Sequence, residues 1–131
     1  GTTPLMGVYK YAEPVTNCGF VFMDSPGYDP ASVTGQIAGG CNLVCFTTGR
    51  GSAFGSKPAP TIKIATNTEM ARRMSEDMDI DAGTILSEGI SVADKGREIY
   101  EMFLRVASGE TQVAEPPLGC HRSFHHYQGE S

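Results

Sequence analysis

Three short apolar runs lie in the first half of the chain, and each passes into a turn rich in small and polar residues. The runs cover residues 20–23, 43–46 and 62–65. Compact runs of β-favouring residues that end in turn residues are typical of buried strands. We therefore predict three strands, each leading into a loop that contains Gly, Ser, Thr or Asp.

Helical signals follow two of these runs. Residues 30–40 predict a short helix with Asp29 at the N-cap, Pro30 at the first helical position and Gly39 at the C-terminal stop. A helix between two buried strands favours a βαβ unit with parallel pairing. After the third run, Thr68 is expected to cap a helix over residues 69–74.

The clearest helix lies in the last third of the chain. Ser91 and Asp94 form a start that resembles a capping box, and Gly109 suits the end. Between them, apolar residues recur with the spacing i, i+3, i+4 and i+7, which predicts one buried stripe. The stripe consists of Ile99, Met102, Phe103 and Val106.

The order of elements predicts an α/β fold, a Rossmann-like three-layer domain with a short, mostly parallel sheet flanked by helices. We assign residues 1–110 to this domain. Residues 111–131 have two prolines, three histidines and no helical period, so we expect an irregular C-terminal tail. In open α/β sheets, ligands bind beyond the carboxyl ends of the strands, which is where the polar loops lie.

Length and charge exclude several classes of protein. With 131 residues the chain has the length of one domain, and its net charge of −5 argues against general binding of nucleic acid. No apolar run approaches the roughly 20 residues of a membrane-spanning helix. The four cysteines fit buried free thiols better than a disulfide framework, which favours a cytoplasmic protein.

Residues 47–60, TTGRGSAFGSKPAP, form the loop richest in candidate chemistry. Its glycines permit close backbone approach, Arg50 offers a planar fork suited to a carboxylate or phosphate, and Lys57 adds a second cation. A tight turn with a surface Arg remains an equal alternative. Neither the GxxxxGK[ST] nor the GxGxxG order is present, so nucleotide binding ranks last. The candidate substrate-binding residues are Thr47, Thr48, Gly49, Arg50, Gly51 and Ser52.

Other polar residues allow two interpretations each. Asp24 either faces the same crevice as Arg50 or starts a turn, and we slightly favour the turn. The alternating acids Asp77, Asp79 and Asp81 could bind a divalent cation, but a solvated face or the capping of a neighbouring loop is favoured. The methionines at 70, 74, 78 and 102 suggest core filling, and the histidines at 121, 125 and 126 suggest a docking or flexible segment rather than a metal site.

Taken in order, the segments MDSPG, TTGRGS, KPAP and DMDIDAG resemble the C-terminal part of the altronate dehydratase/galactarate dehydratase family. The resemblance extends over residues 1–110, and KPAP is closer to the altronate branch. It implies that the chain is a C-terminal fragment that enters mid-protein, inactive by itself.

The resemblance implies a hydro-lyase that converts acidic sugars such as altronate or galactarate into 2-keto-3-deoxy acids. It also implies a divalent metal, typically iron, with ligands expected upstream of this fragment. On this view Arg50 and its loop hold the substrate, while Asp24 or Lys57 assists proton transfer. The expected partners are the small acidic sugar and the upstream domains of the same protein. We expect no binding of nucleic acid or membrane, and the resemblance leaves open whether the protein forms a homo-oligomer. Sulfolactate sulfo-lyase of the same family and a non-catalytic anion-binding or assembly module are the alternatives.

Overall fold

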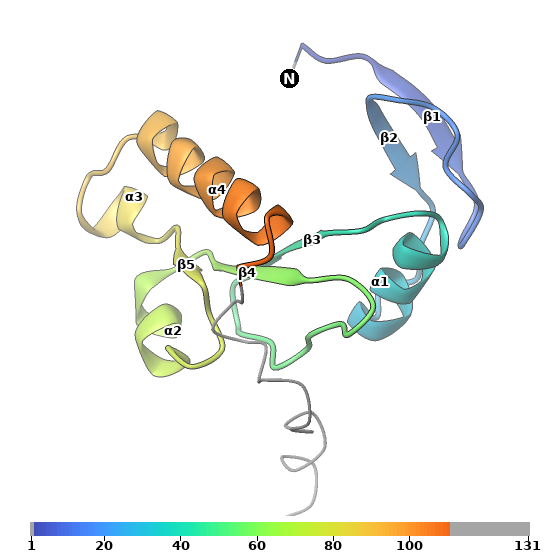
Figure 1. Ribbon diagram of the computed structural model, residues 1–131. Coiled ribbons are helices and arrows are strands. Elements are labelled where there is room, and N and C mark those ends of the chain that lie inside the picture. Colours follow the sequence, from blue (N-terminus) through green and yellow to red (C-terminus); the bar gives the residue numbers. More distant parts are fainter. Residues whose placement is uncertain (1, 111–131) are drawn as a thin grey trace, which may run out of the picture. The chain divides into compact units, whose positions relative to one another are not determined.

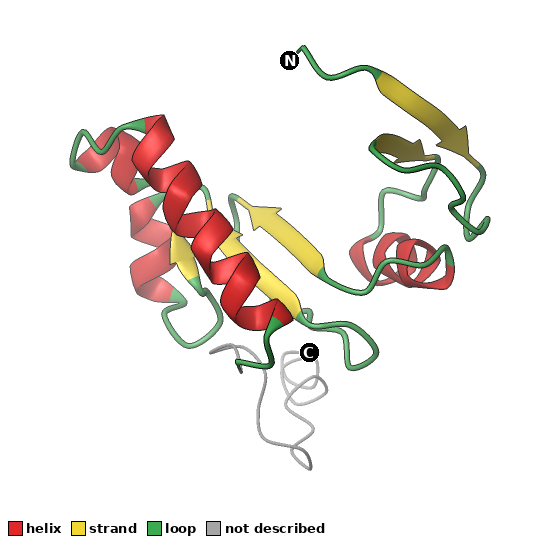
Figure 2. Ribbon diagram, turned by 45° about the horizontal axis from the view of Figure 1, so that its top comes forward, coloured by secondary structure: helices red, strands yellow, loops and turns green. Residues whose placement is uncertain are grey.

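The computed structural model describes residues 2–110 of the chain, which form two compact units. The first unit ends at Val44 and the second begins at Cys45. Each unit contains a small sheet with parallel strands and at least one helix, as Figures 1 and 2 show. The predicted α/β class is therefore confirmed.

The first unit contains β1 (Leu5–Tyr9), β2 (Phe20–Met23) and α1 (Asp29–Ala38). β1 and β2 pair in parallel, although only the loop of residues 10–19 connects them. The buried phenol of Tyr9 organises this loop, since its oxygen accepts hydrogen bonds from the backbone N–H groups of Thr16 at 3.2 Å and Asn17 at 2.9 Å.

One face of the β1–β2 pair carries exposed apolar side chains. In the parallel register Leu5 lies opposite Phe20, and Val8 lies opposite Phe22. Each of these four side chains has more than half of its surface exposed. The opposite face is better covered, and it includes the buried Tyr9 together with the half-buried Met23.

The second unit is built around a three-stranded sheet in the order β3-β4-β5. The strands are β3 (Val44–Thr48), β4 (Thr61–Ala65) and β5 (Ile80–Asp81), and β4 pairs in parallel with β5. All five residues of the central strand β4 are buried, as expected for a strand with covered faces in a parallel sheet.

Three helices follow β4 in this unit: α2 (Thr68–Arg73), α3 (Thr84–Ser87) and α4 (Val92–Ala107). Figure 1 shows α2 and α4 on opposite sides of the sheet, and Figure 2 shows α4 crossing its face. α2 packs through Met70 on Ala65 and Met78, which confirms the expected core role of these methionines. Along α4, the predicted stripe is buried at Val106 and half-buried at Ile99, Met102 and Phe103.

Both ends of α4 follow the sequence prediction. Ser91 Oγ accepts a hydrogen bond from Asp94 N at 3.0 Å and donates one to Asp94 Oδ2 at 2.6 Å. At the other end, Gly109 has a φ of +97°. The N–H of Gly109 bonds to Val106 O, and that of Glu110 bonds to Arg105 O, which is a Schellman ending.

Three local predictions require correction. The caps of the other helices lie one residue earlier than expected: Tyr28 precedes α1, without a side-chain hydrogen bond, and Asn67 rather than Thr68 caps α2. β2 pairs with β1, a strand that the sequence did not suggest, so β2, α1 and β3 do not form the predicted βαβ pairing. The Rossmann-like layering of the whole domain stays a prediction.

The cysteine prediction is only partly right. Cys18, Cys41 and Cys45 are free thiols, as expected, but Cys18 and Cys45 are exposed and Cys41 is half-buried. The general burial preference of cysteine was therefore misleading here. Cys120, the three histidines and the assigned tail of residues 111–131 lie outside the described residues. Among the helices of residues 2–110, none is long and apolar enough to cross a membrane.

The cap of α4 gives a stability prediction. Ser91→Ala removes the acceptor for Asp94 N–H, so we expect the free energy of unfolding to fall by about 1 kcal/mol. Ser91→Thr keeps a hydroxyl at the same position and serves as the control. Urea denaturation followed by circular dichroism measures both variants, and an equal loss in the two would contradict the capping role.

Candidate functional site

The three strands of the second unit end at the same edge of their sheet. Thr66 N, just after β4, donates to Thr48 O at the end of β3 over 3.0 Å. Ala82 N, just after β5, donates to Ala65 O at the end of β4 over 2.8 Å. The loops that follow the strands therefore start side by side, at the edge where α/β sheets bind ligands.

The loop after β3 turns tightly at Gly51. The N–H of Gly51 donates to Thr48 Oγ1 at 3.0 Å, and its φ is +98°. A Cβ atom on Gly51 would collide with the sulfur of Met74, because the loop packs directly on the α2 region. The backbone conformation favours glycine here, and a larger residue would also require the Met74 side chain to move.

Side chains from other segments bind three carbonyl oxygens of this loop. Asn67 Nδ2 donates to Gly49 O at 2.7 Å, and Arg73 Nη2 donates to Arg50 O at 3.4 Å. Lys63 Nζ donates to Ser52 O at 2.9 Å. Three acceptors of the loop backbone are thus occupied from within the protein.

Several N–H donors of the same loop have no partner among the described residues. Within residues 2–110, the backbone N–H groups of Arg50, Ser52 and Ala53 make no hydrogen bond. The guanidinium of Arg50 is exposed and likewise has no acceptor in this part of the chain. A loop with three occupied carbonyls, three unoccupied N–H groups and an exposed guanidinium is suited to an anion.

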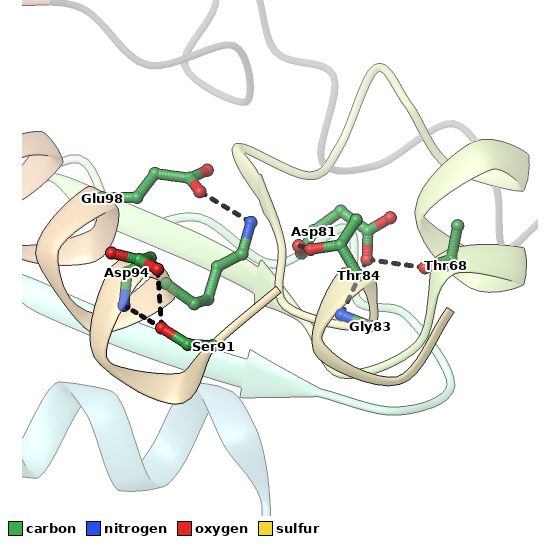
Figure 3. Close-up of polar contacts among 8 residues, drawn as sticks. Thr68, Asp81, Gly83, Thr84, Ser91, Asp94 and Glu98 are labelled. Atoms are coloured by element: carbon green, nitrogen blue, oxygen red, sulfur yellow. Dashed lines mark hydrogen bonds and ion pairs between the residues drawn. The ribbon is translucent and has the colours of Figure 1, made fainter. Parts of the chain in front are cut away.

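A second polar group lies at the ends of β4 and β5. Asp81 Oδ1 accepts hydrogen bonds from Gly83 N at 2.8 Å and from Thr68 Oγ1 at 3.3 Å, and Figure 3 shows these contacts. Thr68 Oγ1 also lies 2.9 Å from Ser87 Oγ. Asp81 therefore joins the start of α2 to the start of α3.

The alternating acids act as caps, as favoured from the sequence. Asp79 Oδ2 accepts from the backbone N–H of Lys63 at 2.8 Å, and Asp77 Oδ1 lies 3.8 Å from Lys63 Nζ. Each of the three carboxylates thus contacts a different group, and Asp81 binds the starts of α2 and α3. Among the described residues, no group of three or more His, Cys, Asp or Glu side chains could hold a metal ion.

Lys63 is a buried cation in the centre of the sheet, with a relative exposure of 1%. Burial lowers the pKa of its ammonium group below the usual 10.5, while Asp77 and Asp79 oppose this effect by favouring the charged form. The ammonium therefore depends on nearby oxygen atoms for its stabilisation.

The structure brings the six predicted substrate-binding residues together, since they form the end of β3 and its following loop. Lys57 lies farther along this loop, exposed and without a partner among the described residues. Asp24 directly follows β2 in the first unit, where it is exposed and its N–H donates to Tyr9 O at 2.9 Å. Its expected position beside Arg50 stays a prediction, as do the site roles of all these residues.

Three residues that bind the loop were missed from the sequence, namely Lys63, Asn67 and Arg73. Lys63 could have been found because it lies inside the apolar run IKIA, and a lysine that is buried with its strand needs oxygen partners. Asn67 offered a weaker signal, since an amide at a helix start can cap the helix and bind a second group at once.

Comparison with known proteins gives one family. Residues 1–130 match the family model described as D-galactarate/altronate dehydratase, C-terminal. Galactarate dehydratase (L-threo-forming) of Escherichia coli K12 is 34% identical over 124 residues, which cover 95% of this chain and 24% of that protein. Altronate dehydratase of Bacillus subtilis 168 is 36% identical over 110 residues, covering 84% of this chain and 22% of that protein.

A third relative is named for a different reaction. The (2R)-sulfolactate sulfo-lyase subunit beta of Chromohalobacter salexigens is 38% identical over 118 residues, covering 90% of this chain and 30% of that protein. The chain thus spans about a quarter of the length of the relatives it matches.

The double role of Asn67 can be separated by two substitutions. Asn67→Asp keeps an oxygen to cap Met70 N–H but places a carboxylate oxygen opposite Gly49 O, so we expect faster amide exchange at residues 49–52 with α2 intact. Asn67→Ala removes both contacts and should also lower the free energy of unfolding by about 1 kcal/mol. Hydrogen–deuterium exchange and urea denaturation measure the two effects. Unchanged loop exchange in Asn67→Asp would refute the bridging role.

The buried Lys63 predicts a pH dependence of stability. Between its lowered folded pKa and 10.5, the unfolded chain holds more protons at this residue than the folded chain. The contribution of Lys63 to the free energy of unfolding must therefore rise with pH across this window. Urea denaturation at a series of alkaline pH values measures the free energy of unfolding of the unmodified protein and of Lys63→Met. We expect the value for the unmodified protein minus the value for the variant to increase with pH. A constant or falling difference would contradict the prediction.

Proposed function

Because the chain belongs to the D-galactarate/altronate dehydratase C-terminal family, we propose that it supplies the anion-binding part of the substrate site in a hydro-lyase acting on acidic sugars. The observation that carries the proposal is the loop after β3. Three of its carbonyls accept hydrogen bonds from Asn67, Arg73 and Lys63, while the guanidinium of Arg50 and the N–H groups of residues 50, 52 and 53 have no partner among the described residues. A carboxylate matches this set of donors.

The reaction explains why such donors are useful. Dehydration removes the proton next to the carboxylate and a hydroxide from the neighbouring carbon, and the resulting enol becomes a 2-keto-3-deoxy acid. The proton is weakly acidic, so the negative charge that develops on the carboxylate must be stabilised. In our proposal Arg50 and the N–H groups of Ser52 and Ala53 bind the carboxylate, while the hydroxyls of Thr47, Thr48 and Ser52 face the sugar hydroxyls.

Proton transfer is assigned to Asp24 or Lys57. Lys57 follows the substrate loop and is exposed, so it is accessible to a bound substrate. Asp24 follows the end of β2, which is a suitable position for a group that acts on a ligand. If either residue moves the proton, Asp24→Asn or Lys57→Met lowers kcat more than it raises KM.

A divalent metal, with iron as the first candidate, is proposed for the whole enzyme. Such an ion would supply Lewis-acid assistance to the departing hydroxyl. The described residues do not fit it, because no three of their His, Cys, Asp or Glu side chains are grouped so that they could hold a metal ion. We therefore assign its ligands to the upstream domains, which are also the proposed partners of this one.

Sulfolactate is the second candidate substrate. The sulfo-lyase subunit beta is 38% identical to this chain, and sulfolactate also carries a carboxylate that the same loop could bind. Because that relative is a subunit beta, we also propose that this chain can work within an assembly of separate subunits. Which acid is bound depends on groups that face the rest of the substrate rather than its carboxylate.

The proposal is tested in the full-length protein with metal supplied. We expect Arg50→Ala to lower kcat/KM for the preferred acid by roughly 100-fold, since a charge-assisted fork to a carboxylate is lost. Arg97→Ala is the matched control, because Arg97 is an exposed arginine of α4 that pairs with Asp94. The assay compares altronate, galactarate and sulfolactate. Equal kcat/KM in the Arg50→Ala protein and the unmodified protein would refute the substrate role of the loop.

The same assay separates catalysis from simple binding. A non-catalytic anion-binding module would bind these acids, as measured by calorimetry, without eliminating water or sulfite from any of them. Turnover of altronate or galactarate supports the hydro-lyase, whereas turnover of sulfolactate alone supports the sulfo-lyase.

A further inference from the structure

Lys63 lies beneath the loop to which we assign the substrate carboxylate. We propose that Lys63 is a positioning residue, whose ammonium group holds the loop at Ser52 in the shape that binds the acidic substrate. The inference rests on the proposed function for the identity of the substrate. The contacts that suggest the role of Lys63 lie within the chain itself. They involve Ser52, Asp77 and Asp79.

The contact with the loop is direct. Lys63 Nζ donates to Ser52 O at 2.9 Å, and Ser52 Oγ in turn accepts the N–H of Phe54 at 3.2 Å. Ser52 follows Gly51, whose turn is fixed by Thr48. The bond from Lys63 thus fixes the second half of the loop, just as the bond from Asn67 to Gly49 O fixes the first half.

The acidic segment before β5 holds Lys63 in place. Asp79 and Lys63 exchange backbone contacts, since Lys63 N donates to Asp79 Oδ2 at 2.8 Å and Asp79 N donates to Lys63 O at 2.9 Å. Asp77 Oδ1 lies 3.8 Å from the ammonium, and its side chain is 40% exposed. Asp77 therefore supplies a counter-charge to the ammonium, and Asp79 holds the backbone of Lys63.

The chemistry of the group favours positioning over a role in proton transfer. An ammonium that is 1% exposed cannot reach a solvent-facing ligand, whereas its charge still strengthens its bond to a carbonyl. A neutral side chain of similar length would fill the same space in the strand without binding Ser52 O. The loop would then lose one of its three side-chain attachments while the sheet remained packed.

The experiment uses the full-length, metal-supplied protein and the Lys63→Met substitution. A buried ion replaced by an apolar side chain of similar volume is often tolerated by the fold, and circular dichroism checks this. We expect amide exchange at residues 49–54 to accelerate about tenfold, and KM for the preferred acid to rise about tenfold with kcat changed less than about threefold. A purely structural role would not produce this selective change in KM.

Lys95→Met is the matched control. Lys95 is the other buried lysine of the described residues, with a relative exposure of 5%, and its Nζ pairs with Glu98 of α4 at 2.6 Å instead of with the loop. We expect loop exchange and KM to remain unchanged in this variant. An equal effect of both substitutions would overturn the proposal, because it would indicate a general loss of packing.

A second variant covers the case in which Lys63→Met does not fold. Asp77→Asn keeps the lysine but removes a partly exposed counter-charge, and we expect a smaller rise of about threefold in both loop exchange and KM. The proposal is overturned if exchange at residues 49–54 is unchanged, or if it accelerates without a rise in KM. Failure of the proposed function appears separately, as the absence of turnover of every tested acid by the unmodified protein.

Discussion

The second unit depends on one constraint, which is that a lysine occupies the centre of its buried middle strand. The ammonium of Lys63 can be accommodated there only with oxygen partners, and these come from the loop after β3 and from the acidic segment before β5. The same residue therefore connects a turn on one side of β4 with the strand on the other side. The ammonium binds the loop at Ser52 O, while the backbone of the same residue is held by Asp79.

Elements that carry their own local signal could be predicted from the sequence. β2 and β4 are compact apolar runs, and α4 has both an apolar stripe and marked ends at Ser91 and Gly109. β1 could not be predicted from its own residues. It forms a strand by pairing with β2, and the loop between the two strands is held by hydrogen bonds to the Tyr9 phenol. The βαβ prediction failed for the same reason: adjacency along the chain does not fix which strands pair.

The candidate site shows a similar division. Arg50 and its glycines could be found from the sequence, since residue type and spacing alone suggest an anion loop. The hydrogen bonds to three of its carbonyls come from Asn67, Lys63 and Arg73, which are remote along the chain, and the sequence gave no sign that they bind this loop. A net charge of −5 gave no indication of such a site, because overall charge averages over the local arrangement of donors.

The attachments of the loop also bear on the order in which the protein folds. Ser52, Gly49 and Arg50 are held by residues that lie 11, 18 and 23 positions farther along the chain. Such contacts form only after the intervening segments have closed, so they come later than the turns of α4, which need only local neighbours. On the ribosome, the loop cannot acquire its final shape until β4 and α2 have been synthesised. Assembly of the ligand-binding edge is consequently a late event in the maturation of this unit.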